Sequence, residues 1–183
     1  TERNVCDLCH HRKPFFFRRY SGVKLCKPCF AKSIEDKMRA TISKYRMFKF
    51  DDKIAVGVSG GKDSVSLLHI LAKIEGDYPK AQLVAISVDE GIKGYRDEAL
   101  KIAADNCRRL GTEHVTVSFK KLFGYTFDQM VSRLKRKGDV RQTPCAFCGV
   151  MRRKALNIAA RDLKADKLAT GHTLDDETQT ILL

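Results

Sequence analysis

The stretch "VGVSGGKDSVSLL", residues 56–68, decides the fold of this chain. An apolar run stops at Ser59, glycines and polar residues follow as far as Ser64, and apolar residues then resume at helical spacing. A strand, a glycine turn and a helix start form an arrangement that binds phosphate, because backbone N–H groups converge at the positive end of the helix. The stretch matches neither GxxxxGK[ST] nor GxGxxG. It therefore indicates a phosphate-binding loop of another kind.

Strands and helices alternate from residue 53 onward. The expected strands cover 53–59, 81–90, 113–119 and 163–172, and the expected helices cover 64–75, 95–110 and about 150–162. This alternation predicts an α/β fold with a doubly wound parallel sheet. Such sheets bind ligands beyond the carboxyl ends of their strands, where the strand order reverses. Because 59–64, 89–91 and 171–176 each follow a strand, we expect these three segments to meet on one rim.

Composition and charge restrict the class of protein. The 183 residues suffice for one domain and a small appendage, and Lys plus Arg exceed Asp plus Glu by 35 to 22, giving a net charge of +13. This surplus suggests a nucleic-acid partner, with a merely basic surface as the alternative. No apolar stretch approaches the ~20 residues that span a bilayer, so no membrane is expected. The polar start shows no secretory signal, and we expect a cytoplasmic protein. Residues 171–183 resemble a helix that is just beginning, so we expect truncation at the C-terminus.

Six of the seven cysteines form three CxxC pairs. In a cytosolic chain, paired thiols are more typical of metal ligands than of disulfides. The two pairs Cys6/Cys9 and Cys26/Cys29 are sixteen residues apart, which is the spacing of a four-cysteine zinc site. Redox dithiols or a disulfide are the alternatives, and His10 and His11 could compete as ligands. We predict a zinc knuckle over 1–32 with a short hairpin between its pairs.

Cations and aromatic residues alternate inside this knuckle. They are Arg12, Lys13, Phe15, Phe16, Phe17, Arg18 and Arg19. Nucleic-acid surfaces combine the same residue types, although the phenylalanines could instead cover the zinc. Apolar residues at helical spacing over 31–47 predict a helix. We assign 33–50 to a linking helix and 51–183 to the α/β domain.

The residue types of the central loop suit the binding of a polyphosphate. Gly60 and Gly61 let backbone N–H groups approach an anion, Lys62 adds positive charge, and Asp63 can hold Mg²⁺. The hydroxyls of Ser59 and Ser64 add donors. SGGKDS after a strand resembles the PP-loop of ATP pyrophosphatases. That resemblance implies that ATP is cleaved between its α- and β-phosphates, so that a substrate is adenylylated and pyrophosphate leaves.

The third CxxC pair, Cys145/Cys148, stands just before a helix rich in basic residues. Alone it is equally typical of a redox motif, half a zinc site or an iron–sulfur ligand pair. Together with SGGKDS, the four-cysteine knuckle and "ATGHTLDDETQT", it resembles the TtcA/TtuA superfamily of tRNA 2-thiolation enzymes. The segments "VDEGIKGYRDEAL", "FGYTFDQMV" and "CAFCGVMRRKAL" are most similar to the archaeal and eukaryotic branch that thiolates the wobble uridine, position 34. A sister branch thiolates position 54 of the T-loop.

The resemblance implies roles for individual residues. The implied nucleotide contacts are Gly57, Val58, Ser59, Gly60, Gly61, Asp63 and Ser64, with Val88, Arg152 and Gly171. The implied catalytic residues are Cys145, Cys148, Asp176, Asp63 and Lys62. In the family, the residues that match Cys145 and Cys148 ligate a [4Fe–4S] cluster with a third, later cysteine, and Asp176 matches an acid near the open iron.

Two features depart from that pattern. No cysteine follows residue 148, and the second zinc knuckle usual at the family's C-terminus is absent, which both fit truncation. Cys107 stands in an expected helix, where a core thiol is the simpler interpretation. His172 is either a ligand or a packing residue of the rim.

The predicted reaction has two steps. The 2-oxygen of a tRNA uridine attacks the α-phosphorus of ATP, and sulfur then displaces AMP. The implied partners are tRNA and a ubiquitin-like sulfur carrier or sulfide, with a homodimer possible. The alternatives are an amide-forming PP-loop synthetase of the NAD or GMP synthetase kind and a non-catalytic, zinc-dependent RNA-binding module.

Overall fold

The computed structural model describes residues 4–92, 94, 96–136 and 143–182. The chain divides into two compact units, Thr1–Phe48 and Lys49–Leu183, each of which is described below by itself. The boundaries expected from the sequence, at 32/33 and 50/51, stay predictions. No helix in the described part of the chain combines the length and the apolar character needed to cross a membrane.

The first unit is a hairpin followed by a long helix. Strands β1 (Phe16–Arg18) and β2 (Val23–Leu25) pair antiparallel, which confirms the expected hairpin, and α1 spans Lys27–Lys44. Its small core consists of Cys6, Leu25 and Cys26, all buried. So few apolar side chains bury little surface, and a unit of this size depends on a further source of stability such as a metal.

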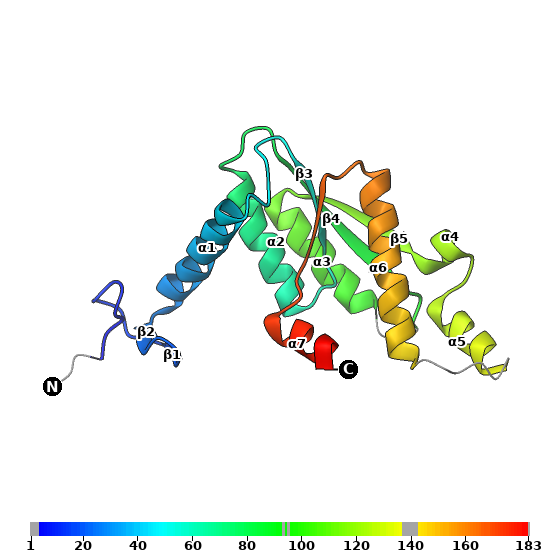
Figure 1. Cartoon of the computed structure of the whole chain (residues 1–183), viewed down its shortest axis with the longest axis horizontal. Coiled ribbons are helices and arrows are strands. Elements are labelled where there is room, and N and C mark those ends of the chain that lie inside the picture. The colour runs from blue at the N-terminus through cyan, green and yellow to red at the C-terminus, as the bar shows by residue number, and fades with distance from the viewer. Residues whose placement is uncertain (1–3, 93, 95, 137–142, 183) are drawn as a thin grey trace. The chain divides into compact units, whose positions relative to one another are not determined.

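The second unit is built on a four-stranded parallel sheet (Figure 1). Its strands are β3 (Lys53–Gly57), β4 (Gln82–Asp89), β5 (Glu113–Ser118) and β6 (Lys167–Thr170). Its helices are α2 (Lys62–Glu75), α3 (Asp97–Leu110), α4 (Phe119–Phe123), α5 (Phe127–Arg136), α6 (Pro144–Asp162) and α7 (Leu174–Leu182). Helices α2 and α3 cover one face and α6 covers the other (Figure 1). The predicted doubly wound α/β fold is confirmed.

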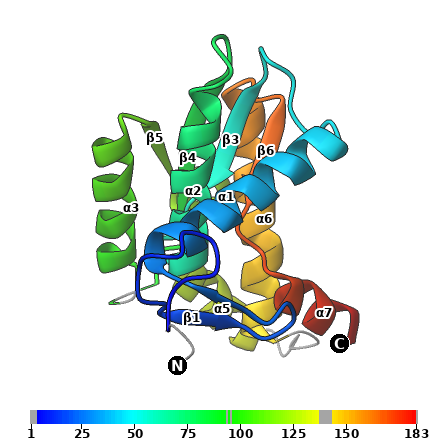
Figure 2. The same ribbon diagram turned by 90° about the vertical axis from the view of Figure 1, so that its left-hand side faces the viewer.

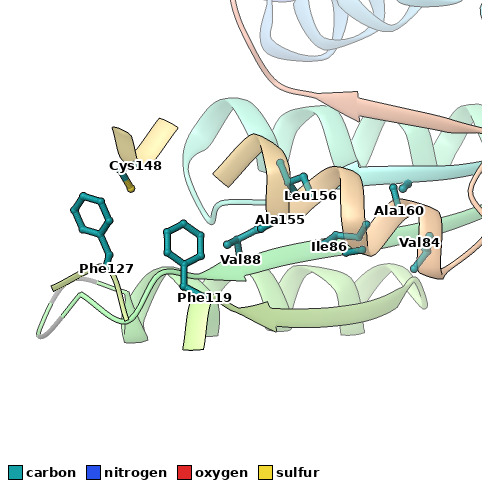
Figure 3. Packing of buried hydrophobic residues seen from close by; sticks show 11 residues of the cluster. Val84, Ile86, Val88, Phe119, Phe127, Cys148, Ala155, Leu156 and Ala160 are labelled. Atoms are coloured by element: carbon teal, nitrogen blue, oxygen red, sulfur yellow. The ribbon is translucent and has the colours of Figure 1, made fainter. Parts of the chain in front are cut away.

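Alternation along β4 produces the main core. Val84, Ile86 and Val88 point to the face covered by α6, where they meet Ala155 and Leu156 (Figure 3). Because successive strand residues point to opposite faces, the intervening residues of β4 face α2 and α3. Every residue from 83 to 88 is buried. This buried run, apolar except for Ser87, is typical of a central parallel strand with both faces covered.

The strand order places the reversal point beside β3. The order across the sheet is β5-β4-β3-β6 (Figure 2), so the chain moves one way from β3 to β5 and then returns to pair β6 with the other side of β3. At such a point the connections that leave neighbouring strands diverge and open a crevice. The loop after β3, which contains SGGKDS, therefore lies at the ligand-binding position of the sheet.

Several boundaries differ from those expected. The strand expected over 163–172 is only Lys167–Thr170, because Ala165 N–H donates to Ala160 O and Lys164 takes a positive φ of 53°, closing the end of α6. Helix α6 begins at Pro144, not near 150, since Thr143 Oγ1 accepts from Ala146 N–H as an N-cap. Helices α4 and α5 were not expected. A reciprocal capping pair, Thr126 with Gln129, marks the start of α5 and was readable in the sequence.

Candidate functional site

Hydrogen bonds between two serines shape the loop after β3. Ser64 Oγ donates to Gly61 O at 3.0 Å and accepts from Ser59 N–H at 3.1 Å, and the two serine hydroxyl oxygens lie 3.0 Å apart. Because the Ser64 proton goes to Gly61 O, the Ser59 hydroxyl donates between the two serines. Ser64 is buried, with 7% of its surface exposed. Its hydroxyl therefore holds the loop in shape, a role that the sequence did not indicate.

Two glycines permit close approach of backbone segments at this loop. Gly60 has φ +84°, and a Cβ there would lie 2.2 Å from Ala99 O of α3. A Cβ at Gly171 would lie 3.0 Å from backbone atoms of Asp63 and Ser64. At Gly60 the positive φ and the short distance to Ala99 O both exclude a residue with a Cβ. Gly171 lets the chain after β6 lie directly against the start of α2.

A cavity of about 290 Å³ opens beside this loop, at the carboxyl ends of β3, β4 and β6. Its lining contains nine of the ten expected nucleotide residues: Gly57, Val58, Ser59, Gly61, Asp63, Ser64, Val88, Arg152 and Gly171. Gly60 and Lys62 are not among the lining residues. Lys62 is 90% exposed at the start of α2, with Nζ 3.6 Å from Asp63 Oδ1. The lining also includes residues that were not expected: Ile86, Arg96, Gly149, Arg153, Leu156 and Thr170.

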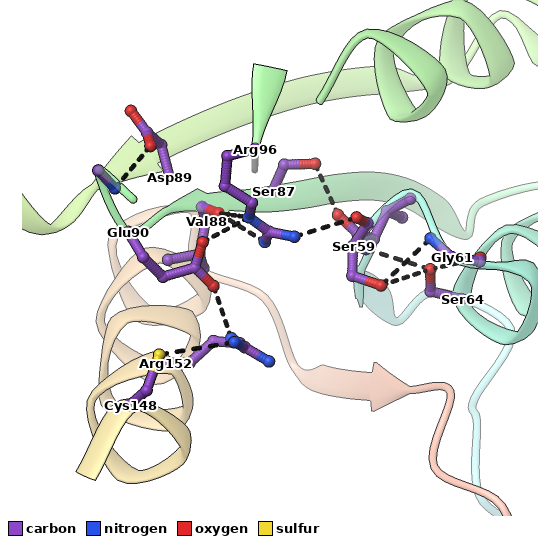
Figure 4. A network of polar contacts seen from close by, with 12 residues as sticks. Ser59, Gly61, Ser64, Ser87, Val88, Asp89, Glu90, Arg96, Cys148 and Arg152 are labelled. Atoms are coloured by element: carbon purple, nitrogen blue, oxygen red, sulfur yellow. Dashed lines mark hydrogen bonds and ion pairs between the residues drawn. The ribbon is translucent and has the colours of Figure 1, made fainter. Parts of the chain in front are cut away.

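A buried ionic network borders the cavity (Figure 4). Glu90, 1% exposed, pairs with Arg96 and accepts from Arg152 Nε at 2.6 Å. Arg96 Nη2 donates to Val88 O at 2.7 Å and its Nη1 donates to Ser59 O at 3.2 Å. Glu90 was missed in the sequence, because an acidic residue at a strand end is usually an exposed polar residue. The available signal was an acidic pair directly after an apolar strand, with an arginine six residues later.

The third cysteine pair lies in the first turns of α6, not in a turn before a helix. Cys145 is exposed, whereas Cys148 is 6% exposed and points toward Phe127 (Figure 3). Burial raises the pKa of the Cys148 thiol, and the nearby Arg152 guanidinium opposes that rise. Arg152 Nη2 lies 3.6 Å from Cys148 Sγ. Arg152 therefore both lines the cavity and contacts Cys148 of the cysteine pair.

The described residues supply two thiols for a metal group at this site. Cys107 is buried in α3 at 1% exposure, as a core thiol is. Cys145 and Cys148 stand about one helical turn apart in the first turns of α6, so their thiols can serve as two ligands of a larger set. The helix N-terminus favours the thiolate form, whereas burial of Cys148 opposes it.

A family model described as a PP-loop domain matches residues 30–183. The chain belongs to the PP-loop domain family. This confirms the resemblance noted in the sequence and the ATP-binding character of the loop.

Several curated proteins and a solved structure are similar to nearly the whole of this chain. Proteins named cytoplasmic tRNA 2-thiolation protein 1, from Dictyostelium discoideum and Arabidopsis thaliana, are each 38% identical over 180 residues. The match covers 98% of this chain and 49% of each relative, so the chain spans about half the length of these curated relatives. The U34-tRNA thiolase NcsA from Methanococcus maripaludis, solved with its [4Fe-4S] cluster, superposes with a TM-score of 0.86 at 36% identity, covering 100% of this chain and 57% of that one.

An NH3-dependent NAD synthetase from Campylobacter jejuni has the same fold at a much lower identity of 17%. It superposes with a TM-score of 0.56 and covers 78% of this chain and 57% of that one. At this identity the likeness extends to the fold alone.

Asp176 of the PP-loop domain caps its own helix. Its carboxylate accepts from Thr173 N–H at 2.6 Å and from Thr173 Oγ1–H at 2.8 Å, and Asp176 N–H donates back to Thr173 Oγ1. These donors, the backbone N–H first, hold the pKa of Asp176 below its usual value. The capping box of α7 was readable as T-x-x-D in the sequence. A catalytic role for Asp176 stays a prediction. His172 lines the cavity, and its Nδ1 lies 3.0 Å from Thr170 Oγ1, so a role as ligand and a role in packing the rim both stay open.

The four N-terminal cysteines form one cluster. The sulfur atoms of Cys6, Cys9, Cys26 and Cys29 all lie within 4.8 Å of one another, and those of Cys9 and Cys26 are 3.8 Å apart. A tetrahedral ion with Zn–S bonds of about 2.3 Å requires sulfur–sulfur separations of about 3.8 Å, so the donor set fits zinc. Among the described residues, the cluster contains the four cysteines and neither His10 nor His11. The Nδ1 atom of His11 lies 2.6 Å from Cys9 O.

The pKa values of the cluster thiols show that these groups cannot all lose their protons without a nearby cation. Burial raises the pKa of the Cys6 thiol, but backbone N–H groups bonded to its sulfur outweigh burial and lower the pKa to about 6. Hydrogen bonding to Cys26, followed by burial, raises the pKa of Cys29 to about 12. Four adjacent thiols cannot all ionise without a compensating positive charge. A divalent cation supplies that charge and replaces the remaining protons.

Proposed function

We propose that this chain carries the ATP-binding and sulfur-handling centre of a cytoplasmic tRNA uridine 2-thiolation enzyme that acts on wobble uridine 34. One observation carries the proposal. The PP-loop cavity and the cysteine pair of α6 share Arg152, which lines the cavity and lies 3.6 Å from Cys148 Sγ. A plain adenylating enzyme has no use for a CxxC pair at this position. The names of the relatives and of the NcsA structure support tRNA as the substrate.

The first step activates the uridine. Its 2-oxygen forms a bond to the α-phosphorus of ATP, the bond from that phosphorus to the bridging β-oxygen breaks, and pyrophosphate leaves. The loop N–H groups hold the pyrophosphate, the Lys62 ammonium attracts it from the exposed start of α2, and Asp63 anchors Mg²⁺ against phosphate oxygens. Adenylation is necessary because an amide-like oxygen is a poor leaving group. The target uridine has to leave its stack, which suits a single-stranded loop.

The second step replaces the activated oxygen by sulfur, and AMP leaves with that oxygen. A [4Fe–4S] cluster bound by Cys145, Cys148 and a third ligand outside the described residues would supply an iron that can carry sulfide. Arg152 sits between these cysteines and the nucleotide cavity, where it can orient both. The sulfur source is a ubiquitin-like carrier protein or free sulfide. Association as a homodimer stays a prediction.

The products of ATP cleavage test this function. Turnover with Mg²⁺ and tRNA is expected to yield AMP and pyrophosphate, measured by chromatography of labelled ATP. Asp63→Ala should abolish turnover by removing the metal anchor, and Lys62→Ala should only weaken it, because that side chain is exposed. ADP as the product would overturn the proposal. ATP–pyrophosphate exchange that requires a carboxylate or amide acceptor in place of tRNA would favour an amide-forming synthetase instead.

We further propose zinc as the ion of the N-terminal cluster. Metal analysis of protein purified without oxygen should find about one zinc per chain, because the cluster offers one tetrahedral site. Cys6→Ser/Cys9→Ser should lose the zinc and unfold the first unit. The matched control is Cys145→Ser/Cys148→Ser, which removes a CxxC pair elsewhere and should retain zinc. Loss of zinc from the control, or its retention by the first variant, would contradict the assignment.

The knuckle is also proposed to contact RNA. Phe15 and Phe17 are each 53% exposed and Tyr20 is 77% exposed, with the Arg18 guanidinium 5.7 Å from the Tyr20 ring. Phe16, 38% exposed, packs on Phe30 with ring centroids 4.6 Å apart, and Phe15 meets the same ring edge-on at 5.6 Å. Two of the three phenylalanines thus pack on Phe30, and the exposed faces of Phe15, Phe17 and Tyr20 can stack on bases.

Salt dependence tests the RNA interaction. The slope of log affinity against log salt is negative. For every phosphate that the protein no longer neutralises, its magnitude should decrease by roughly 0.7–0.9. Arg18→Gln/Arg19→Gln should therefore flatten the slope for tRNA by roughly 1 to 2, measured by filter binding. The control is Arg108→Gln/Arg109→Gln, a basic pair on α3 of the other unit. Equal slopes for the native chain and the Arg18/Arg19 variant would place the RNA surface elsewhere.

A further inference from the structure

The buried carboxylate of Glu90 is not accounted for by the reaction just described. It is 1% exposed and lies directly after β4, which ends at Asp89. Burying a charged carboxylate is costly unless opposite charges compensate it. Here two guanidiniums do so, those of Arg96 and Arg152. Both of these arginines also line the nucleotide cavity, so the buried carboxylate is linked to the site through its two partners.

The two arginines have different surroundings. The Arg96 side chain is 8% exposed, and it donates to the carbonyl oxygens of Val88 and Ser59, one at the end of β4 and one in the PP-loop. The Arg152 side chain is 42% exposed, and both arginines line the nucleotide cavity. Figure 4 shows the carboxylate of Glu90 between the two guanidinium groups. One carboxylate thus fixes the direction of both arginines relative to the loop.

The charges of this group leave a surplus. Two guanidiniums and one carboxylate sum to one positive charge, and its exposed end, Arg152, faces the cavity. An anion completes such a group, and phosphate suits the planar donors of arginine. We propose that Glu90 is a positioning residue for ATP: it holds Arg96 against the PP-loop and aims Arg152 at the phosphates. This inference rests on the proposed function, since it assumes that the cavity takes ATP.

Removal of the Glu90 carboxylate could change ATP affinity in either direction, and the direction depends on what the carboxylate does. If Glu90 acted only as a nearby negative charge, its removal would tighten ATP binding. If it positions the arginines, Glu90→Gln leaves Arg96 buried without a compensating charge, and Arg96 then moves away from Ser59 O and Val88 O. Water and salt screen the long-range charge at the open side of the cavity, so the geometric loss dominates. We therefore expect ATP binding to weaken by roughly tenfold or more, as for the removal of a charged hydrogen bond.

The experiment measures ATP affinity by calorimetry on the intact chain with Mg²⁺. Glu90→Gln is compared with Asp105→Asn, which also removes a carboxylate paired with an arginine, Arg108, but at an exposed site of α3. The control should bind ATP as the native chain does. Glu90→Asp keeps the charge but is one methylene too short to reach both arginines, so it should also weaken binding. If circular dichroism shows that Glu90→Gln does not fold, the ATP affinity of Glu90→Asp is used as the test instead.

A double-mutant cycle separates positioning from general stability. The losses of affinity in Glu90→Gln and Arg152→Ala should be less than multiplicative when combined, because part of the Glu90 effect acts through Arg152. Fully multiplicative losses, or equal or tighter ATP binding by Glu90→Gln, would overturn the inference. A native chain that binds no ATP at all would instead overturn the proposed function. The two failures are thereby distinguishable.

Discussion

Gly60→Ala is expected to lose ATP binding almost completely. The residue has φ +84°, where a side chain is strained, and its new Cβ would lie 2.2 Å from Ala99 O. That oxygen is backbone of α3 and cannot rotate away, so the PP-loop itself must shift. A displacement of about 1 Å at a catalytic loop costs roughly 100-fold in reaction rate. We expect at least that loss in the rate of ATP cleavage, together with a loss of ATP affinity measured by calorimetry with Mg²⁺, because the same loop holds the phosphates.

The neighbouring glycine provides the control for this prediction. At Gly61 a Cβ would meet only Ser59 Oγ, at 3.5 Å, and φ is −78°, a value that any residue adopts. Gly61→Ala should therefore fold with an unchanged thermal midpoint, whereas Gly60→Ala should show a lower one. If Gly60→Ala bound ATP as tightly as Gly61→Ala, the close approach to α3 would not restrain the loop.

Cys148→Ala is expected to abolish tRNA thiolation while ATP binding remains. The native protein purified without oxygen should be brown from an iron–sulfur cluster, and the variant should be colourless. Thiolation should fall below detection in a mass-spectrometric assay of 2-thiouridine. ATP affinity should change little, because the PP-loop lies on another segment and Arg152 keeps its bond to Glu90. Sulfur transfer would then be separated from adenylation.

Cys107→Ala is the matched control for the cysteine prediction. Both thiols are buried, at 1% for Cys107 and 6% for Cys148, so both substitutions remove a similar volume from a core. Of the two, Cys148 lies beside an arginine of the cavity wall, and Cys107 lies in α3. The control should keep its colour and its thiolation activity. Full thiolation by colourless, iron-free protein would refute the cluster and leave a persulfide relay of Cys145 and Cys148 as the better account.

Features that depend on local pattern could be predicted from the residues alone. Apolar runs alternating with helical spacing predicted the parallel sheet, and two glycines after a strand predicted the PP-loop. The sixteen-residue spacing of two CxxC pairs predicted the cluster of four cysteines, whose sulfur atoms meet within 4.8 Å. These features were predictable because neighbours in the chain produce them: a strand, a turn, a helix start or a pair of ligands needs few residues.

The side chains that complete the site are set by long-range packing instead. The buried ionic network combines residues from distant parts of the chain: Glu90 follows β4, Arg96 precedes α3, and Arg152 belongs to α6. Their charges meet only after α6 packs on β4 (Figure 4). The Ser64 hydroxyl, expected as a further donor, is also hydrogen-bonded inside the loop, where it donates to Gly61 O and accepts from Ser59 N–H. Helix α6 begins at Pro144 because Thr143 caps it, and this start places Cys148 in the core beside Phe127. Burial and ion pairing depend on contacts far apart in the sequence, so no local pattern could specify them.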